Sequence, residues 1–252
     1  MKILVTGATG AIGKEIVMRL AAKGHTMLLA CRSTDKAIPV MREAIRIGAP
    51  EARVIRLDLS DSASVKEGVA EILSNGVDGV INNAGTMNGA FRLDSDGHED
   101  TLNVNYHNTR LLNELLTPSI ARGGVIVFTT SATRRWFPLQ KKTYDISQDE
   151  FSRLRAYALS KKLITSYAME LSLRLAPHGI RVNCCDPGVV DSPMLRMGKW
   201  FDPLTDRLFR PLCFSPATGA DAAVRAFESD KTGRIFTAPF GSFSIPKRLF
   251  LR

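Results

Sequence analysis

Short apolar runs alternate with longer amphipathic stretches along most of the chain. The apolar runs predict about seven buried strands, at residues 3–5, 26–31, 53–57, 79–81, 124–130, 180–185 and 234–236. Helical periodicity falls between them, at residues 14–23, 37–47, 61–73, 97–120, 156–175 and 216–229. Strand and helix alternate without a repeat or linker, so we expect one α/β domain over residues 1–252. Its sheet is predicted to be parallel and doubly wound, with helices on both faces.

A glycine-rich turn joins the first predicted strand to the first predicted helix. Gly7, Gly10 and Gly13 fall at intervals of three, with Thr9 and Ile12 between them. Glycines in such a turn allow close backbone approach to a diphosphate, and the helix start offers free N–H groups and a positive dipole end. The pattern predicts a dinucleotide-binding loop; an ordinary strand-to-helix turn is the alternative.

The end of the second predicted strand carries a base where many NAD-binding proteins of this fold carry an acid. Arg32 and Ser33 stand there, and the nearest carboxylate is Asp35. A guanidinium can bind a 2′-phosphate with charge-assisted hydrogen bonds. We therefore expect NADP(H) rather than NAD(H), although Arg32 at a strand end can also simply face solvent.

Small and polar residues follow the other predicted strands at their carboxyl ends, where open parallel sheets bind ligands. These positions are Asp58-Leu59, Asn82-Asn83-Ala84-Gly85, Ser131 and Asp186-Pro187-Gly188. Asn103 and Asn105 lie inside a predicted helix, which is unfavourable unless their amides are used. We expect all of these positions to contribute to one site.

Tyr157 and Lys161 lie one turn apart on the helix predicted at residues 156–175. Their side chains should therefore project side by side. A nearby ammonium favours the phenolate and lowers the pKa of a phenol, which then exchanges protons with a substrate oxygen near neutral pH. Taken alone the pair is weak evidence, because Tyr and Lys often meet on helix surfaces.

The ordered set of these features resembles the short-chain dehydrogenase/reductase family over nearly the whole chain. The resemblance implies a Rossmann fold and hydride transfer between a nicotinamide and an alcohol/carbonyl pair. It implies that Tyr157 donates or accepts the proton, that Lys161 lowers its pKa and binds ribose, that Ser131 binds the substrate oxygen and that Asn105 supports a relay water. We expect cofactor contacts from Gly7, Thr9, Gly10, Ile12, Gly13, Arg32, Ser33, Asp58, Leu59, Asn83, Ala84, Gly85, Tyr157, Lys161, Pro187, Gly188 and Val190.

Two departures from the commonest family pattern refine this interpretation. Ala11 replaces a glycine, so the loop spacing is closer to the epimerase-type members of the family. Twenty-five residues separate Ser131 from Tyr157, a long gap that resembles the retinol-dehydrogenase-like branch. That branch often acts on retinoids, steroids or other lipophilic alcohols and carbonyls, and we expect a substrate of this kind.

The composition limits the remaining possibilities. The net charge is +9 and the pI about 9.6, but the basic pairs are dispersed, so a solvated surface and an anionic ligand are favoured over nucleic-acid binding. No apolar run reaches membrane-spanning length or forms a signal-peptide core, so the expected location is the cytoplasm. Cys31, Cys184, Cys185 and Cys213 lack metal-binding spacing; we expect reduced thiols and no metal.

The segment at residues 189–214 mixes apolar, aromatic and basic side chains and follows Pro187-Gly188. We interpret it as a substrate-covering lid; simple packing on the domain and contact with a membrane surface are the alternatives. By the family resemblance we also expect a homodimer or homotetramer.

Three other functions stay open at this point. The first is a catalytically idle NADPH-binding sensor or scaffold, which the retained catalytic set argues against. The second is a nucleotide-sugar epimerase or dehydratase, supported only by the Gly10 spacing. A nucleic-acid binder is the least supported.

Overall fold

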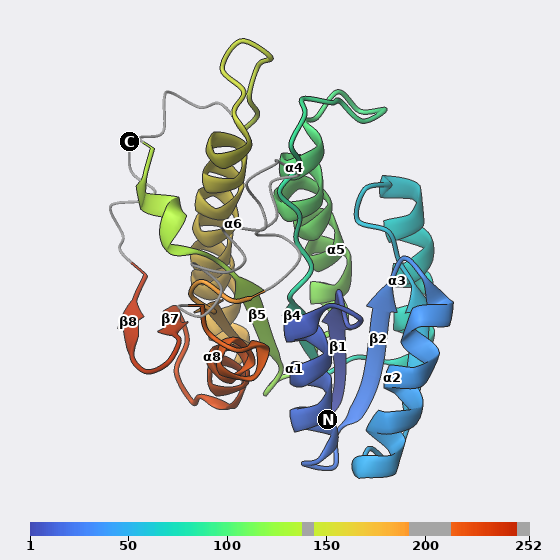
Figure 1. Cartoon of the computed structure of the whole chain (residues 1–252). Coiled ribbons are helices and arrows are strands. Elements are labelled where there is room, and N and C mark those ends of the chain that lie inside the picture. The colour runs from blue at the N-terminus through green and yellow to red at the C-terminus, as the bar shows by residue number, and fades with distance from the viewer. Residues whose placement is uncertain (138–143, 192–212, 246–252) are drawn as a thin grey trace.

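The computed structural model describes residues 1–137, 144–191 and 213–245 and contains one mostly parallel sheet (Figure 1). The strand order is β3-β2-β1-β4-β5-β6-β7-β8, parallel throughout except for antiparallel β8 at the edge. The strands are β1 (Lys2–Thr6), β2 (Thr26–Cys31), β3 (Ala52–Arg56), β4 (Gly79–Asn82), β5 (Val125–Thr129), β6 (Arg181–Asp186), β7 (Arg234–Thr237) and β8 (Ser242–Ser244). The predicted doubly wound parallel sheet is confirmed. The eighth strand was not predicted, because three residues with two serines give no strand signal.

Helices connect the strands in the predicted order. The long ones are α1 (Ala11–Ala21), α2 (Thr34–Ile47), α3 (Ser62–Asn75), α5 (Asn108–Leu116), α6 (Arg153–Leu175) and α8 (Pro216–Glu228). The short ones are α4 (Asp100–Leu102), the π-helix η1 (Asn103–His107) and the 3-10 turns η2 (Thr117–Ser119), η3 (Ala132–Arg135) and η4 (Ala176–His178). The predicted helix at residues 97–120 is therefore shorter and is interrupted by η1, and the expected loop after Ser131 begins with η3.

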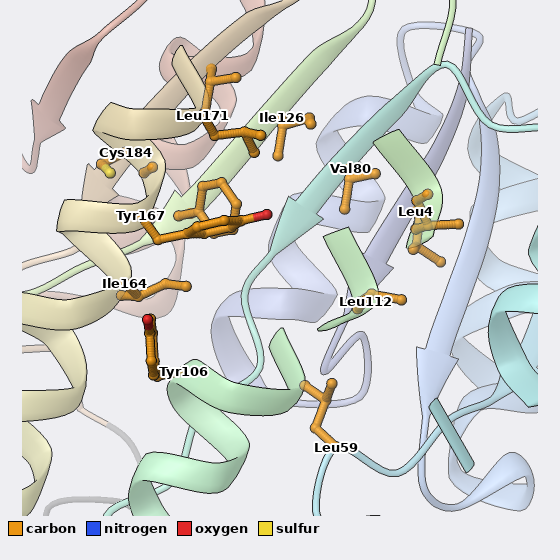
Figure 2. Packing of buried hydrophobic residues seen from close by; sticks show 14 of the residues in the cluster. Leu4, Leu59, Val80, Tyr106, Leu112, Ile126, Ile164, Tyr167, Leu171 and Cys184 are labelled. Atoms are coloured by element: carbon orange, nitrogen blue, oxygen red, sulfur yellow. The ribbon is translucent and has the colours of Figure 1, made fainter. Parts of the chain in front are cut away.

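The two faces of the sheet carry separate apolar cores. Strand residues such as Leu4, Val80, Ile126 and Cys184 pack under α3, α5 and α6. Figure 2 shows Ile164, Tyr167 and Leu171 of α6 on the same side as Ile126. Alternate strand residues, including Ile3, Ile81 and Cys185, pack with α1, α2 and α8 on the other face. Neighbouring strand residues point to opposite faces, so both layers of helices are held by burial of the same strands.

The carboxyl ends of β1 and β4 lie side by side where the strand order reverses. From β1 the chain continues outward through β2 and β3, and it then returns to form β4 on the other side of β1. Ligands bind in the crevice at such a switch point, because the connecting loops separate there. This topology places the glycine-rich loop and residues 83–85 at the same edge of the sheet.

Some sequence-based boundaries shift because of local capping. α1 begins at Ala11, earlier than predicted, since Gly10 is its N-cap. α6 begins at Arg153, and the Ser152 hydroxyl caps it by accepting from the Arg155 N–H. Both helices therefore reach the site edge of the sheet a turn sooner than apolar periodicity indicates.

The lid hypothesis concerns residues 189–214, most of which, 192–212, lie outside the described residues. Among the described residues, no helix combines the length and the apolar content needed to cross a bilayer. The homodimer or homotetramer stays a prediction.

Candidate active site

The glycine-rich loop packs directly against the segment after β4. Gly7 has a φ of 65°, which favours glycine, and a Cβ on Gly13 would lie 2.2 Å from the Gly7 carbonyl oxygen. The Asn83 side-chain amide donates to the Thr6 carbonyl at 3.0 Å, and the Thr6 hydroxyl accepts from the N–H groups of Asn83 and Ala84. Only a glycine loop can turn this tightly against residues 83–84.

The start of α1 is suited to an anion. Gly10 supplies no side-chain cap, whereas Asp61, Ser152 and Ser215 cap α3, α6 and α8. The first turn of a helix has N–H groups without intrahelical acceptors, and an uncapped start leaves them for a ligand. Together with the tight loop, this arrangement fits the diphosphate of a dinucleotide.

The end of β2 carries the predicted 2′-phosphate residues. Arg32 is exposed, and Ser33 is the N-cap of α2 but its hydroxyl makes no capping bond. Asp58, at the end of β3, accepts from both the N–H and the hydroxyl of Ser60. The neighbouring Leu59 carbonyl accepts from the Asn108 amide at 3.0 Å. The loop after β3 is thus fixed by the protein, while Arg32 is exposed and Ser33 is half-buried.

Tyr157 and Ser131 come together although 25 residues separate them. Tyr157 lies in the first turns of α6, and Ser131 follows β5 as the N-cap of η3. The Ser131 hydroxyl lies close enough to the Tyr157 hydroxyl to act on its pKa. Burial raises the pKa of Tyr157 to about 12, the Asp186 carboxylate adds to this, and the Ser131 hydroxyl opposes it. The expected lowering of the tyrosine pKa by Lys161 is therefore not what this structure shows, because burial dominates.

Lys161 is 4% exposed and projects beside Tyr157. Its Nζ lies 5.5 Å from the centre of the Tyr157 ring and donates to the Thr129 carbonyl at 3.0 Å. Burial lowers the pKa of Lys161 to about 8, while the Asp186 carboxylate opposes the shift. At neutral pH the side chain is mainly an ammonium, so α6 presents a phenol and a cation to the same crevice.

Asn105 lies in the π-helix η1, and its amide is fully used. It accepts from the Thr86 N–H and donates to the Thr86 carbonyl, both at 2.8 Å, and donates to the Ser160 hydroxyl at 3.0 Å. π-helical turns often mark functional sites because they redirect side chains. A Cβ on Gly85 would lie 3.3 Å from Asn105 Oδ1 and 3.4 Å from Lys161 Nζ. Gly85 is therefore the point where the segment after β4 meets η1 and α6.

The predicted contacts after β6 gather around α8. Gly188 has a φ of 70° and donates its N–H to Asp186 Oδ1 at 3.1 Å. A Cβ on Gly219 would lie 2.7 Å from Val190, 3.3 Å from Pro187 and 3.5 Å from Ile12. The structure thus brings the loop after β6 next to the first turn of α1, as a shared cofactor site requires.

One central ion pair was missed from the sequence. The dispersed basic pairs of the sequence were expected to lie on a solvated surface; Arg134-Arg135 is one of these pairs, but Arg134 is only 3% exposed. Its guanidinium donates to Asp186 Oδ2 at 3.1 Å and to the Ser131 carbonyl at 2.6 Å. Burial of a charge requires a partner, and the partner is far away in the sequence, so periodicity gave no signal.

One group of three potential metal ligands occurs among the described residues: His98, His107 and Asp145. His98 Nδ1 lies 3.0 Å from Asp145 Oδ2, and the imidazole rings stack 3.7 Å apart at an interplanar angle of 10°. A histidine binds a metal through an in-plane nitrogen lone pair. Two nearly parallel, separated rings cannot both direct such a lone pair at one ion, so we interpret the cluster as structural.

The same cluster predicts a pH dependence of stability. Burial, followed by the neighbouring His98, lowers the pKa of His107 from 6.5, against the opposing effects of Asp145, the Tyr144 carbonyl and Asp94. Below about pH 6.5 the unfolded chain binds a proton at His107 more readily than the folded protein does. The free energy of unfolding therefore decreases as the pH falls.

We therefore expect the wild type to lose unfolding free energy relative to His107→Asn as the pH falls from 7 to 5. The maximum slope is about 1.4 kcal/mol per pH unit for one proton. Urea unfolding at several pH values measures it, with exposed His178→Asn as control. Parallel wild-type and His107→Asn curves would contradict the expectation.

With this geometry established, comparisons with known proteins identify the family. A profile described as short chain dehydrogenase matches residues 1–199. An uncharacterized oxidoreductase of Schizosaccharomyces pombe is 30% identical over 93% of this chain and 76% of its own length. The chain belongs to the short-chain dehydrogenase/reductase family. Its fold and oxidoreductase class follow from that membership.

Named relatives support the retinol-dehydrogenase-like branch. Human retinol dehydrogenase 12 is 30% identical, over 88% of this chain and 71% of its own. Mouse retinol dehydrogenase 13 is 29% identical over 77% of this chain, and the match spans only 60% of that relative. A short-chain dehydrogenase of Burkholderia cenocepacia, solved with NADP, is 25% identical with a TM-score of 0.75, and covers 94% of this chain and 95% of its own.

Proposed function

We propose that this protein is an NADP(H)-dependent oxidoreductase that interconverts an alcohol and a carbonyl, with Tyr157 as general acid and base. The observation that carries the proposal is the convergence of four side chains from three elements at one edge of the sheet. Ser131 lies near the Tyr157 hydroxyl, Lys161 lies beside the Tyr157 ring, and Asn105 and Lys161 both approach Gly85.

The side chains divide the work of the reaction. The nicotinamide, when bound, supplies or accepts the hydride. In reduction, the Tyr157 phenol donates a proton to the oxygen that gains negative charge, and in oxidation its phenolate takes that proton back. The Ser131 hydroxyl donates to the same oxygen, and the Lys161 ammonium stabilises negative charge on Tyr157. Asn105 acts by fixing Thr86 and Ser160, because both of its amide hydrogens are already used.

Turnover separates this function from that of an idle NADPH-binding relative. Purified protein is mixed with NADPH and a panel of aldehydes and ketones, and the absorbance of NADPH is followed. We expect carbonyl-dependent oxidation of NADPH. Tight NADPH binding without turnover on any carbonyl would instead favour a sensor.

The expected substrate is apolar. The support comes from relatives named retinol dehydrogenase and polyprenol dehydrogenase, the latter from mouse and 31% identical over 88% of this chain. A panel that pairs long apolar aldehydes with short hydrophilic ones tests this. A higher kcat/KM for hydrophilic aldehydes or sugars would overturn the substrate class but leave the reaction type standing.

The preference for NADP(H) rests on the end of β2. Arg32 is exposed at the start of the turn into α2, and Ser33 leaves its hydroxyl without a capping bond. Both can reach a phosphate bound at the start of α2, where the helix dipole is also favourable. The Asp35 carboxylate in the first turn of α2 repels a phosphate at this position and so reduces the preference for NADP(H) over NAD(H).

Arg32→Asp should reverse the cofactor preference. A charge-assisted hydrogen bond contributes about 1.5–3 kcal/mol, so the ratio of NADPH to NADH affinity should fall by about 10- to 150-fold. Titration of cofactor fluorescence measures both affinities. Exposed Arg122→Asp at the opposite end of the sheet removes the same charge and should leave the ratio unchanged. Equal effects of the two variants, or a wild type that binds both cofactors equally, would reject the assignment.

A further inference from the structure

The buried pair of Arg134 and Asp186 links the catalytic serine to the loop after β6. Asp186 ends β6, and its two carboxylate oxygens accept from the Arg134 guanidinium and from the Gly188 N–H. The guanidinium also donates to the Ser131 carbonyl. The exposed fractions of Arg134 and Asp186 are 3% and 6%, so neither charge is solvated.

Burial of both charges of an ion pair is unusual unless the charges have a structural or functional role. An ion pair taken out of water contributes little to stability, because desolvation offsets the attraction. Here both partners instead bond backbone groups at the site. Arg134 donates to the backbone carbonyl of Ser131, whose hydroxyl lies near Tyr157. Asp186 accepts from the backbone N–H of Gly188.

The pair also faces the groups that exchange protons. Asp186 lies next to the end of β5, where Thr130 donates its N–H to the Cys185 carbonyl at 2.8 Å. Its carboxylate raises the pKa values of both Tyr157 and Lys161. Among the described residues, the other ionisable groups that face this region are the buried thiols of Cys184 and Cys185, whose pKa values burial raises. The two thiols are therefore neutral near pH 7, and the charges that the described residues contribute here are those of Lys161, Arg134 and Asp186.

We propose that the Arg134–Asp186 ion pair holds the Ser131 hydroxyl in place and sets the electrostatic potential at Tyr157. Both are positioning residues for the proton transfer, and the inference rests on the proposed function. The proposal predicts that loss of Arg134 and loss of Asp186 have opposite effects on the ionisation of Tyr157. Loss of Asp186 leaves a cation near Tyr157 and favours the phenolate, whereas loss of Arg134 leaves an anion and favours the phenol.

The pH dependence of alcohol oxidation tests this. Oxidation needs the phenolate, so its rate rises with pH until Tyr157 is ionised. Asp186→Asn should move this rise to lower pH by about one unit, and Arg134→Met should move it upward by about as much. The neutral double variant should return close to the wild-type pH profile. Arg134→Lys keeps the charge and should retain the wild-type profile with a lower kcat, because the shorter side chain places its ammonium away from the guanidinium nitrogen that bonds both the Ser131 carbonyl and Asp186.

The adjacent arginine provides the matched control. Both Arg134 and Arg135 lie over the Phe243 ring, at 5.7 and 5.5 Å, but Arg135 is exposed. Arg135→Met should therefore leave the pH profile unchanged. A purely structural pair would lower kcat and thermal stability in the single variants without shifting the profile in opposite directions, and that result would overturn the proposal.

A second readout does not depend on turnover. Tyrosinate absorbance near 295 nm, taken as the difference between each protein and its Tyr157→Phe counterpart, reports the ionisation of Tyr157 alone. Tyr157 should ionise at lower pH in Asp186→Asn than in the wild type, and at higher pH in Arg134→Met. If these shifts occur in a protein without carbonyl turnover, the proposed function fails and the electrostatic role stands. If turnover occurs without the shifts, the role of the pair fails alone.

Discussion

Replacing Tyr157 with Phe should lower turnover by about 10²- to 10⁴-fold and leave NADPH affinity within about twofold. The change removes one oxygen atom and keeps the ring against which Lys161 Nζ lies at 5.5 Å. General acid–base catalysis by a positioned side chain contributes a factor of this size. The ring, α6 and the cofactor loop stay in place, so binding should survive. Single-turnover hydride transfer and fluorescence titration of NADPH measure the two quantities.

A matched tyrosine distinguishes loss of chemistry from general damage. Tyr144 is 57% exposed, its ring stacks on Tyr106, and its hydroxyl has no role in the proposed reaction. Tyr144→Phe should therefore keep full activity. Retention of near-normal kcat in Tyr157→Phe would show that another group supplies the proton, and the mechanism would have to be abandoned.

The state of the Tyr157 proton also favours one direction of reaction at neutral pH. With a pKa of about 12, the side chain is a phenol, which is the form that reduction of a carbonyl needs. Oxidation of an alcohol first requires a base, so its rate should rise with pH over a range where reduction stays nearly constant. The sequence alone suggested a lowered pKa, because the spacing of Tyr157 and Lys161 reveals their proximity but not the depth of burial.

Local patterns were sufficient to predict the order of the elements. Alternating apolar runs located β1 to β7, since buried parallel strands are apolar on both faces. Neighbouring strand residues point to opposite faces, and Cys184 and Cys185 accordingly lie in separate cores. The π-helix η1 and strand β8 were missed, because a change of hydrogen-bond register and an edge pairing leave no apolar period.

The site was only partly visible in the sequence for a similar reason. Residues at the carboxyl ends of strands could be grouped from topology alone, and the structure brings Asn83, Gly85, Ser131 and Tyr157 together at one edge of the sheet. Their supporting partners could not be found. Thr6, Ser160 and Arg134 act through hydrogen bonds to residues that are distant in sequence, and an isolated Thr, Ser or Arg carries no positional signal.

Lys161 illustrates how function opposes stability in this site. Its ammonium is buried, and the lowered pKa of about 8 means that the fold disfavours the charged form. Within the part of the chain that the structure describes, Nζ donates only to the Thr129 carbonyl, at 3.0 Å. A buried ammonium with few hydrogen bonds to offset the loss of solvation is expected where its charge contacts a bound ligand or a reacting group.

Lys161→Met should therefore abolish most activity and also remove a pH dependence of stability. Loss of the ammonium should lower kcat/KM by at least about 100-fold, because phenolate stabilisation and cofactor contact are lost together. Without cofactor, the wild-type unfolded chain keeps the Lys161 proton between about pH 8 and 10.5, whereas the folded protein releases it. Stability of the wild type should then rise relative to the variant by about 2–3 kcal/mol between pH 7 and 10.

The comparison emphasises Lys161 because other groups titrate in both proteins. The thiols of Cys184 and Cys185 and the phenol of Tyr157 have raised pKa values, and they lower stability at alkaline pH in both proteins. The Lys161 ammonium lowers the pKa values of the two thiols, so its loss adds to the same difference in the same direction. Denaturant unfolding at several pH values, plotted as the wild-type minus variant difference, reports the lysine together with this effect. Exposed Lys66→Met serves as the control and should give a flat difference. A flat difference for Lys161→Met as well would mean that its ammonium is solvated, and the buried cation at the centre of the proposed mechanism would not exist.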